Sequence, residues 1–143
     1  MSAWTKRALL ALLPGTALAQ QVAIPPEFAA LPGQPVAALA MHPAVGPRLR
    51  VMSAGRQRQL SDALRGEGPP LAWHGGWLSS WARLGENRAF LAYDPHSEQV
   101  AVMLWVGNGN SLSVPPLRSP WPEGLREGMR GFNPQLEAQM RWE

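Results

Sequence analysis

Residues 71–114 carry the clearest hydrophobic pattern in the chain, a series of short apolar or alternating runs separated by turn residues. Runs rich in branched and aromatic residues, bounded by Gly, Pro, Asn and Asp, predict β-strands. The strands are expected at residues 71–73, 77–81, 88–93, 99–106 and 111–114. Pro95, in Asp94-Pro95-His96-Ser97, occupies the second turn position that a type I turn prefers. Because each connection is short, the pattern predicts an antiparallel meander.

A helix is predicted over residues 53–65, before the meander. Ser53 is placed to cap its start, and its apolar side chains form one narrow stripe of Leu60, Ala63 and Leu64. Gly66 is expected to end the helix in a left-handed conformation. Just upstream, residues 48–51 alternate charged and apolar side chains, which predicts a short edge strand.

After the meander the tail is predicted to be helical. Pro122 and Glu123 suit a first helical turn. One apolar stripe follows at spacings of four, four and three residues, formed by Trp121, Leu125, Met129 and Phe132. Asn133-Pro134 predicts a stop and a new cap before a last short helix. Together these elements predict an α+β fold, an antiparallel four- to five-stranded sheet with helices packed on one face.

The first 19 residues have the pattern of an export signal. Lys6 and Arg7 precede a short apolar run, residues 8–13, and Ala17-Leu18-Ala19 places small residues where a signal peptidase cuts. The run is too short to span a bilayer, which takes about 20 residues. The mature protein is therefore expected to begin at Gln20 and to be periplasmic or secreted.

Residues 20–47 are rich in proline and alanine and are expected to form an extended N-terminal arm. The prolines allow at most one turn of helix, at residues 36–41. A single α+β domain is then expected over residues 48–143. The 124 residues that remain after residue 19 (143 − 19) suffice for one core and not for two. We expect a monomer or a weak dimer.

Removal of the signal changes the charge of the chain. The formal charge falls from +3 to +1, with 11 Arg against 10 acidic residues, because Lys6 and Arg7 leave together. This near-neutral balance gives no general attraction to nucleic acid. One local group of arginines indicates either an anionic partner or the solvated faces of a strand and a helix; its members are Arg48, Arg50, Arg56 and Arg58.

Sequence patterns for catalysis and metal binding are absent. The chain has no cysteine. It also has no G-x-S-x-G nucleophile elbow and no histidine pair or carboxylate cluster at metal-ligand spacing. We therefore expect a protein that is not an enzyme and that uses no metal or other cofactor. The tryptophans suit a small core or a binding surface, and Trp105, on the most apolar strand, is expected in the core.

The run from Trp77 to Val106 resembles the central hairpin of the Ivy-type inhibitors of vertebrate (C-type) lysozyme. In that family a strand leads into a protruding loop of the form C-K-P-H-D-C-G, and an N-R or Q-R pair and two hydrophobic strands follow. Here Gly85, Asn87 and Arg88 match the end of this pattern, and P-W-P-E-G-L-R-E-G-M resembles the family's closing helix. The resemblance implies an exported protein that binds and inhibits a lysozyme.

The chain departs from the family pattern inside the loop. Without gaps, Ser79 and Leu84 occupy the two cysteine positions, and Ala82 occupies the position of the histidine that reaches the lysozyme carboxylates. Arg83 is then the only cation in the loop and would take over the histidine's role. Without the disulfide we expect a mobile loop and weaker inhibition, because ordering the loop costs binding energy.

We therefore hypothesise that a protruding loop over residues 79–86 docks in the cleft of a hydrolase with an acidic site, with C-type lysozyme as the first candidate. The residues assigned to partner binding are Ser79, Ser80, Trp81, Ala82, Arg83, Leu84, Gly85 and Glu86. Trp81 beside Arg83 is a common anchor pair; the alternative is that Trp81 packs in the core and Arg83 is solvated. The alternative function is a non-enzymatic, envelope-associated accessory protein that binds an anionic surface through the arginines of residues 48–58.

Overall fold

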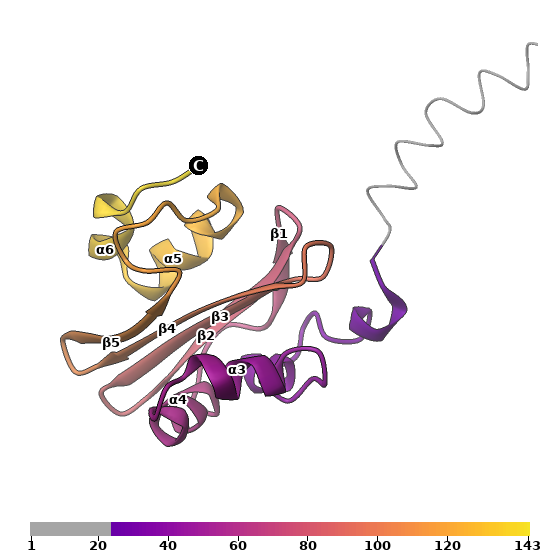
Figure 1. Cartoon of the computed structure of the whole chain (residues 1–143), viewed down its shortest axis with the longest axis horizontal. Helices are drawn as coiled ribbons and strands as arrows, with labels where there is room; N and C mark the ends of the chain where they lie inside the picture. The colour runs from indigo at the N-terminus through magenta and orange to yellow at the C-terminus, as the bar shows by residue number, and fades with distance from the viewer. Residues whose placement is uncertain (1–23) are drawn as a thin grey trace, which may run out of the picture.

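The structure, a computed structural model, describes residues 24–143. The expected export signal, residues 1–19, lies outside the described residues, as does the start of the expected arm. In chain order the described elements are short helices, then five strands, then short helices again (Figure 1).

The five strands form one antiparallel meander, as the hydrophobic pattern predicts. Their order in the sheet is β1-β2-β3-β4-β5, and every neighbouring pair is antiparallel. The strands are β1 (Ala72–His74), β2 (Trp77–Leu84), β3 (Asn87–Asp94), β4 (Gln99–Val106) and β5 (Gly109–Val114). The expected turn after β3 is present, where the Asp94 carboxylate accepts hydrogen bonds from the His96 amide and the Ser97 hydroxyl, each at 2.9 Å. The predicted α+β class is confirmed.

Helices cover both faces of the sheet, so the expectation that they pack on one face is wrong (Figure 1). One face carries η1 (Pro26–Phe28), α2 (Val36–Ala40), α3 (Gly46–Met52) and α4 (Gln57–Leu64), and the other carries η2 (Glu123–Leu125), α5 (Arg126–Phe132) and α6 (Pro134–Gln139). The reason lies in the central strands, which are apolar on both sides. Leu91 and Val102 belong to the first core, whereas Phe90 and Met103 belong to the second.

Residues 48–51 are helical, so the predicted edge strand is wrong. They lie in α3, with Pro47 in its first turn. Leu49 is 8% exposed and Val51 82% exposed. In a strand these two side chains would share a face, whereas residues two apart in a helix point in nearly opposite directions. A four-residue alternation is too short to distinguish the two structures.

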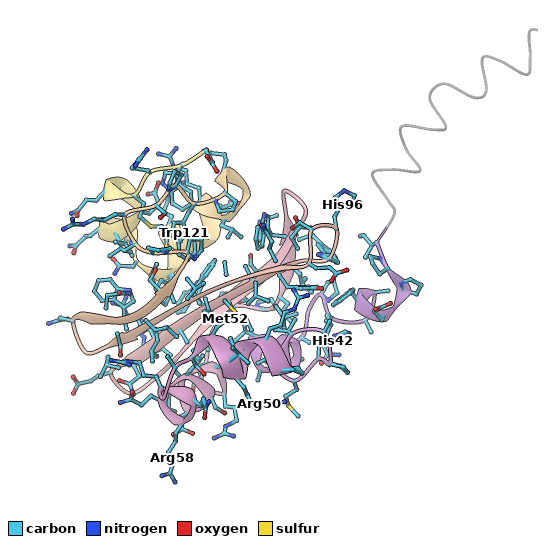
Figure 2. The ribbon with its side chains drawn as sticks, viewed as in Figure 1. His42, Arg50, Met52, Arg58, His96 and Trp121 are labelled. Carbon is cyan, nitrogen blue, oxygen red and sulfur yellow. The ribbon has the colours of Figure 1, made fainter. Side chains whose placement is uncertain are left out.

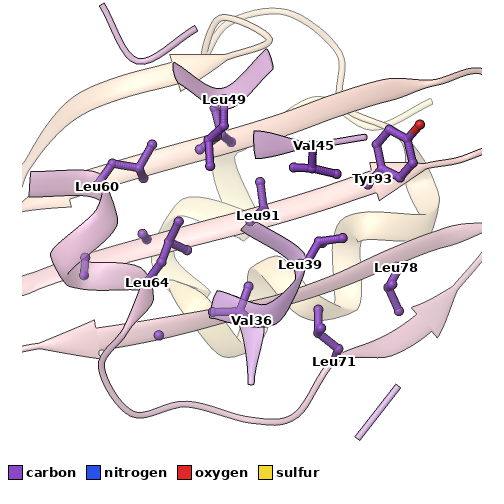
Figure 3. Packing of buried hydrophobic residues seen from close by; sticks show 14 of the residues in the cluster. Val36, Leu39, Val45, Leu49, Leu60, Leu64, Leu71, Leu78, Leu91 and Tyr93 are labelled. Carbon is purple, nitrogen blue, oxygen red and sulfur yellow. The ribbon is translucent and has the colours of Figure 1, made fainter. Parts of the chain in front are cut away.

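The next helix begins later than predicted. Ser53 ends α3, where its hydroxyl donates to the Arg50 carbonyl at 3.1 Å, and does not cap α4. Ala54 and Gly55 then take left-handed conformations, with φ of 48° and 88°, which separate the two helices. The predicted stripe of α4 does face the core, since Leu60, Ala63 and Leu64 are buried (Figure 3).

The segment expected to be an extended arm packs into the first core. Val36, Leu39 and Val45 are buried in the first core, where they pack with residues of α4 and of the sheet (Figure 3). Phe28 is also buried, and its ring stacks on His42 at a centroid distance of 4.4 Å. The prolines keep the helices short, as expected, but the apolar residues between them dock on the sheet and belong to the same folded unit.

The C-terminal helices fill the second core with the predicted stripe. Trp121, Leu125, Met129 and Phe132 are all buried. Asn133 caps α6 as predicted, because its Oδ1 accepts a hydrogen bond from the Leu136 amide at 3.1 Å.

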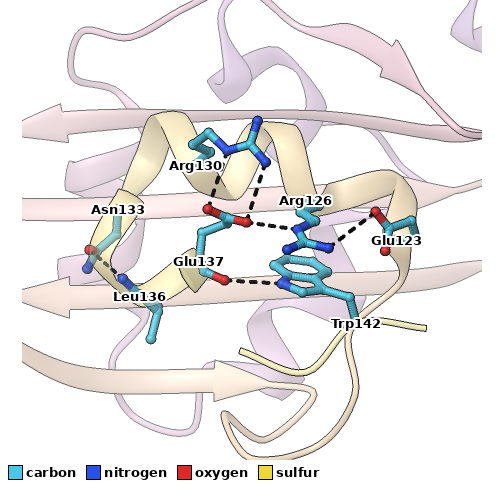
Figure 4. A network of polar contacts seen from close by, with 7 residues as sticks. All are labelled: Glu123, Arg126, Arg130, Asn133, Leu136, Glu137 and Trp142. Carbon is cyan, nitrogen blue, oxygen red and sulfur yellow. Dashed lines mark hydrogen bonds and ion pairs between the residues drawn. The ribbon is translucent and has the colours of Figure 1, made fainter. Parts of the chain in front are cut away.

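A polar network around Glu137 holds α5 against α6 (Figure 4). The Glu137 carboxylate accepts from Arg126 Nε at 2.8 Å and from Arg130 Nε at 3.3 Å. Its carbonyl accepts from Trp142 Nε1 at 3.2 Å, so the end of the chain joins the same network. The hydrogen bonds from Arg126 and then Arg130 lower the pKa of Glu137 below its ordinary value of 4.5.

This pKa shift predicts an acid-dependent loss of stability. A carboxylate with a depressed pKa in the folded state stabilises the fold above its unfolded pKa and loses that contribution as the pH falls through the folded value. We expect Glu137→Gln to lower the free energy of unfolding at neutral pH, with the difference from the wild type closing below pH 4.5. Urea unfolding at a series of pH values measures this difference. A gap that is constant with pH would contradict the assignment.

Candidate functional site

The residues assigned to partner binding lie in a regular hairpin, so the expected protruding loop is absent. β2 continues to Leu84 and pairs with β3 residue by residue, from Leu78 opposite Tyr93 to Leu84 opposite Asn87. The two strands are joined by a turn of two residues, Gly85 and Glu86. Gly85 has a φ of 63°, a conformation that such tight hairpin turns require.

The outer edge of β2 is also paired near the turn. The Glu67 amide donates to the Arg83 carbonyl at 2.9 Å, and the Arg83 amide donates to the Glu67 carbonyl at 2.8 Å. Further along, the Ser80 hydroxyl donates to the Pro69 carbonyl at 2.5 Å. The hairpin is thus supported by hydrogen bonds on both edges of β2, and it contains no loop that a disulfide would have to stiffen.

Four of the eight assigned residues face inward. Ser79, Ser80 and Ala82 are buried in the sheet. Trp81 is half-buried and packs on α5, where its ring meets that of Phe132 at a centroid distance of 6.2 Å and an angle of 65°. For Trp81 the structure therefore supports the packing alternative and not a free anchor.

The other four residues form the exposed tip of the hairpin: Arg83, Leu84, Gly85 and Glu86. Leu84 is 53% exposed, one of the few large apolar side chains in the described part of the chain that face solvent. Within residues 24–143, the side chain of Arg83 forms no ion pair. Arg83 lies opposite Arg88 in the β2–β3 register and opposite Glu67 on the outer edge of β2, and in the described structure it forms no ion pair with Glu67.

Arg88, directly across from Arg83, is held in place by the fold. Its Nη1 donates to the Phe132 carbonyl at 2.9 Å, and its guanidinium lies 5.5 Å from the Phe132 ring and 6.0 Å from the Trp105 ring. These contacts combine a hydrogen bond with cation–π attraction. Arg88 is therefore engaged internally, and Arg83 is the cation of the tip that is available to a partner.

One hollow borders the tip on the side of Arg83, and a second hollow adjoins the first. The first, of about 240 Å³, lies between the β2–β3 turn and the β4–β5 turn, which are joined by a hydrogen bond from the Gly107 amide to the Glu86 carbonyl at 3.0 Å. The second, of about 480 Å³, lies beside Trp105 and the start of α6. Arg88 and Asn108 line both hollows.

Arg88, Trp105 and Asn108 were not among the assigned residues. Trp105 is also only half-buried, so its expected place inside the core is wrong. Asn87-Arg88 belongs to the matched family pattern, but its position beside the tip depends on the strand register. That register brings Trp105 opposite Arg88, which no local pattern indicates.

His42 and His74 have structural partners, and His96 is exposed in the turn between β3 and β4, so the three histidines do not form a reactive centre. His42 stacks on Phe28, and its Nδ1 accepts from the Ala44 amide at 3.0 Å. His74 Nδ1 lies 3.6 Å from Glu127 Oε1. Among residues 24–143, no three His, Cys, Asp or Glu side chains are grouped so that they could hold a metal ion. None of the helices described is long and apolar enough to cross a membrane.

Comparison with known proteins gives one match. The family model described as "Inhibitor of vertebrate lysozyme (Ivy)" matches residues 44–135, which is 92 of the 143 residues and includes all five strands. No curated protein and no solved structure matches the chain.

Proposed function

Because this chain belongs to the Ivy family, the inhibitors of vertebrate lysozyme, we propose that it inhibits a C-type lysozyme through the tip of its β2–β3 hairpin. We further propose that it is exported, because residues 1–19 have the pattern of a signal peptide and a lysozyme of this class would be met outside the cytoplasm. The protein acts by binding and catalyses no reaction.

The chemistry of the enzyme suits an exposed arginine. Glycosidases such as lysozyme cleave their substrate with a pair of carboxyl groups. A guanidinium donates two parallel hydrogen bonds to a carboxylate and keeps its charge at any physiological pH. Arg83 presents such a group at the end of the β2–β3 hairpin, next to the two-residue turn that joins the strands.

The hairpin geometry also decides which side chain can replace the family's histidine. Ala82, which aligns with the histidine, is 1% exposed and faces the first core. Arg83 follows it in the strand and therefore points to the opposite face. Leu84 adds an exposed apolar contact next to the cation. The exposed, unpaired state of Arg83 is the single observation that carries the proposed mechanism.

Arg83→Ala is expected to weaken lysozyme inhibition by about 30-fold or more, which corresponds to the 2 kcal/mol or more lost when an interface hot spot is truncated. The measurement is the inhibition constant in a lysozyme assay, with far-UV circular dichroism to show that the variant is folded. Arg118→Ala is the matched control, because Arg118 is exposed and lies far along the chain from the hairpin.

Two results would reject this mechanism. The first is the absence of inhibition by the wild-type protein at micromolar concentration, which would leave only the shared fold. The second is inhibition that Arg83→Ala leaves unchanged, or that Arg118→Ala reduces equally. The second result would move the binding surface away from the tip.

A further inference from the structure

The positive charge of the protein is concentrated in one layer of helices. Residues 36–65, from α2 to the end of α4, contain five Arg and one Asp, a net charge of +4. Residues 66–143 contain six Arg and eight acidic residues, a net charge of −2. A nearly neutral chain thus has a basic face, which we call the α2–α4 face, and a slightly acidic remainder.

Three of the five arginines of the α2–α4 face have no acidic partner among the described residues, and one of the three, Arg56, donates from its Nε to the Ser111 hydroxyl at 2.6 Å. Arg48 pairs with the Glu98 carboxylate at 3.2 Å, and Arg65 pairs with Asp62 at 2.6 Å. Within the described residues, Arg50 and Arg58 form no ion pair. Both side chains point away from the sheet into solvent (Figure 2). Their charges are therefore free to meet an external anion.

Exposed apolar side chains accompany these charges. Met41 and Val51 are each 82% exposed, more than any other large apolar residue in the described part of the chain. Met41 and Arg50 share the border of a hollow of about 630 Å³ whose floor includes Leu49, between α2, α3 and α4. Val51 borders a second, mainly apolar hollow of about 660 Å³ on the other side of α3.

We propose that the α2–α4 face docks on an anionic phospholipid surface. Arginines beside exposed apolar residues are the features of a protein face that lies at a membrane interface, where the guanidinium groups meet phosphates and the apolar side chains enter the acyl boundary. Nucleic acid would satisfy the arginines but would leave Met41 and Val51 in water. This role is independent of lysozyme inhibition at the hairpin tip.

The test is binding of the mature protein, from Gln20 onward, to vesicles of phosphatidylglycerol and phosphatidylcholine, compared with vesicles of phosphatidylcholine alone. The double variant Arg50→Gln/Arg58→Gln should bind the anionic vesicles about 30-fold more weakly, because each arginine near such a surface contributes about fivefold. Arg118→Gln/Arg141→Gln is the matched control, with the same change of charge outside the α2–α4 face. Residues 1–19 are left out because the proposed export signal, with its cationic and apolar residues, would bind anionic vesicles by itself.

Further results separate a lipid surface from other anions. Met41→Ser/Val51→Ser should also weaken binding to anionic vesicles, although it changes no charge. The Arg50→Gln/Arg58→Gln variant should inhibit lysozyme as the wild type does. Equal binding to both vesicle types, equal loss in the control pair, or binding to a DNA oligonucleotide with none to anionic vesicles would overturn the proposal.

Discussion

Replacing Trp121 with alanine is expected to lower the free energy of unfolding by about 3–5 kcal/mol, the range for removing a buried aromatic side chain. Trp121 is fully buried in the second core. Its ring meets Phe90 at 6.5 Å and 64°, and its Nε1 donates to the Pro116 carbonyl at 3.3 Å. Its main chain also pairs with the end of the chain, accepting from the Glu143 amide at 3.1 Å. Removing the Trp121 side chain would therefore leave a cavity where three segments of the chain meet: β3, the loop around Pro116 and the C-terminal end.

Urea unfolding followed by far-UV circular dichroism measures this loss, and Trp105→Ala provides the comparison. Trp105 is only half-buried, and its Nε1 has no hydrogen-bond partner within the described residues. Removing its side chain therefore gives up less buried area and no hydrogen bond, so a smaller loss is expected. An effect of Trp121→Ala below about 1 kcal/mol, or equal losses in the two variants, would show that the second core is not organised around Trp121.

Gly66→Ala is expected to cost more than about 3 kcal/mol, because a side chain at this position has no space. A Cβ on Gly66 would lie 2.0 Å from the Arg83 carbonyl oxygen and 2.5 Å from its carbonyl carbon. Both atoms are main chain and cannot rotate aside. Either residues 66–68 or β2 must move, which breaks the two hydrogen bonds between Glu67 and Arg83.

The same substitution should weaken lysozyme inhibition, since Arg83 would be displaced from the hairpin tip. Gly109→Ala is the matched control, because the nearest atom to its Cβ would be the Val106 carbonyl oxygen at an ordinary 3.8 Å. That change should alter the free energy of unfolding by no more than about 0.5 kcal/mol. Urea unfolding and the inhibition assay measure the two effects. If Gly66→Ala and Gly109→Ala behave alike, the close contact between residue 66 and β2 is not needed.

Gly66 was correctly predicted to follow the end of a helix, but the structural reason for glycine at this position differs from the predicted one. The helix does end just before it, at Leu64, as the sequence predicts. The predicted left-handed conformation is wrong, because Gly66 is not among the residues with positive φ. Glycine is required there because β2, which follows more than ten residues later, passes too close for any side chain. No local pattern carries that information.

The loop expected over residues 79–86 comes from the resemblance to the family pattern C-K-P-H-D-C-G and not from the local hydrophobic pattern, which predicts a strand over residues 77–81. The structure extends that strand to Leu84. In the folded chain the Ser80 hydroxyl bonds to the Pro69 carbonyl, eleven residues away in sequence, and both Ser79 and Ser80 lie inside the sheet. The tip is therefore smaller than predicted, and the partner-binding assignment now centres on Arg83 and its exposed neighbours.

The antiparallel meander, the turn after β3, the C-terminal stripe and the Asn133 cap were predictable from the sequence, because they depend on periodicity and on residues close together in the chain. The family was also recognisable from the Trp77–Val106 run. Three features depend on the packing of the folded chain: helices cover both faces of the sheet, the proline-rich segment joins the first core, and Arg88 contacts Phe132 and Trp105 while Arg83 forms no ion pair in the described structure. The fold also places the arginines of residues 48–58 together in the layer formed by α3 and α4, where they are exposed. These features depend on which surfaces meet across long sequence separations, and burial and pairing there override the preferences of short segments.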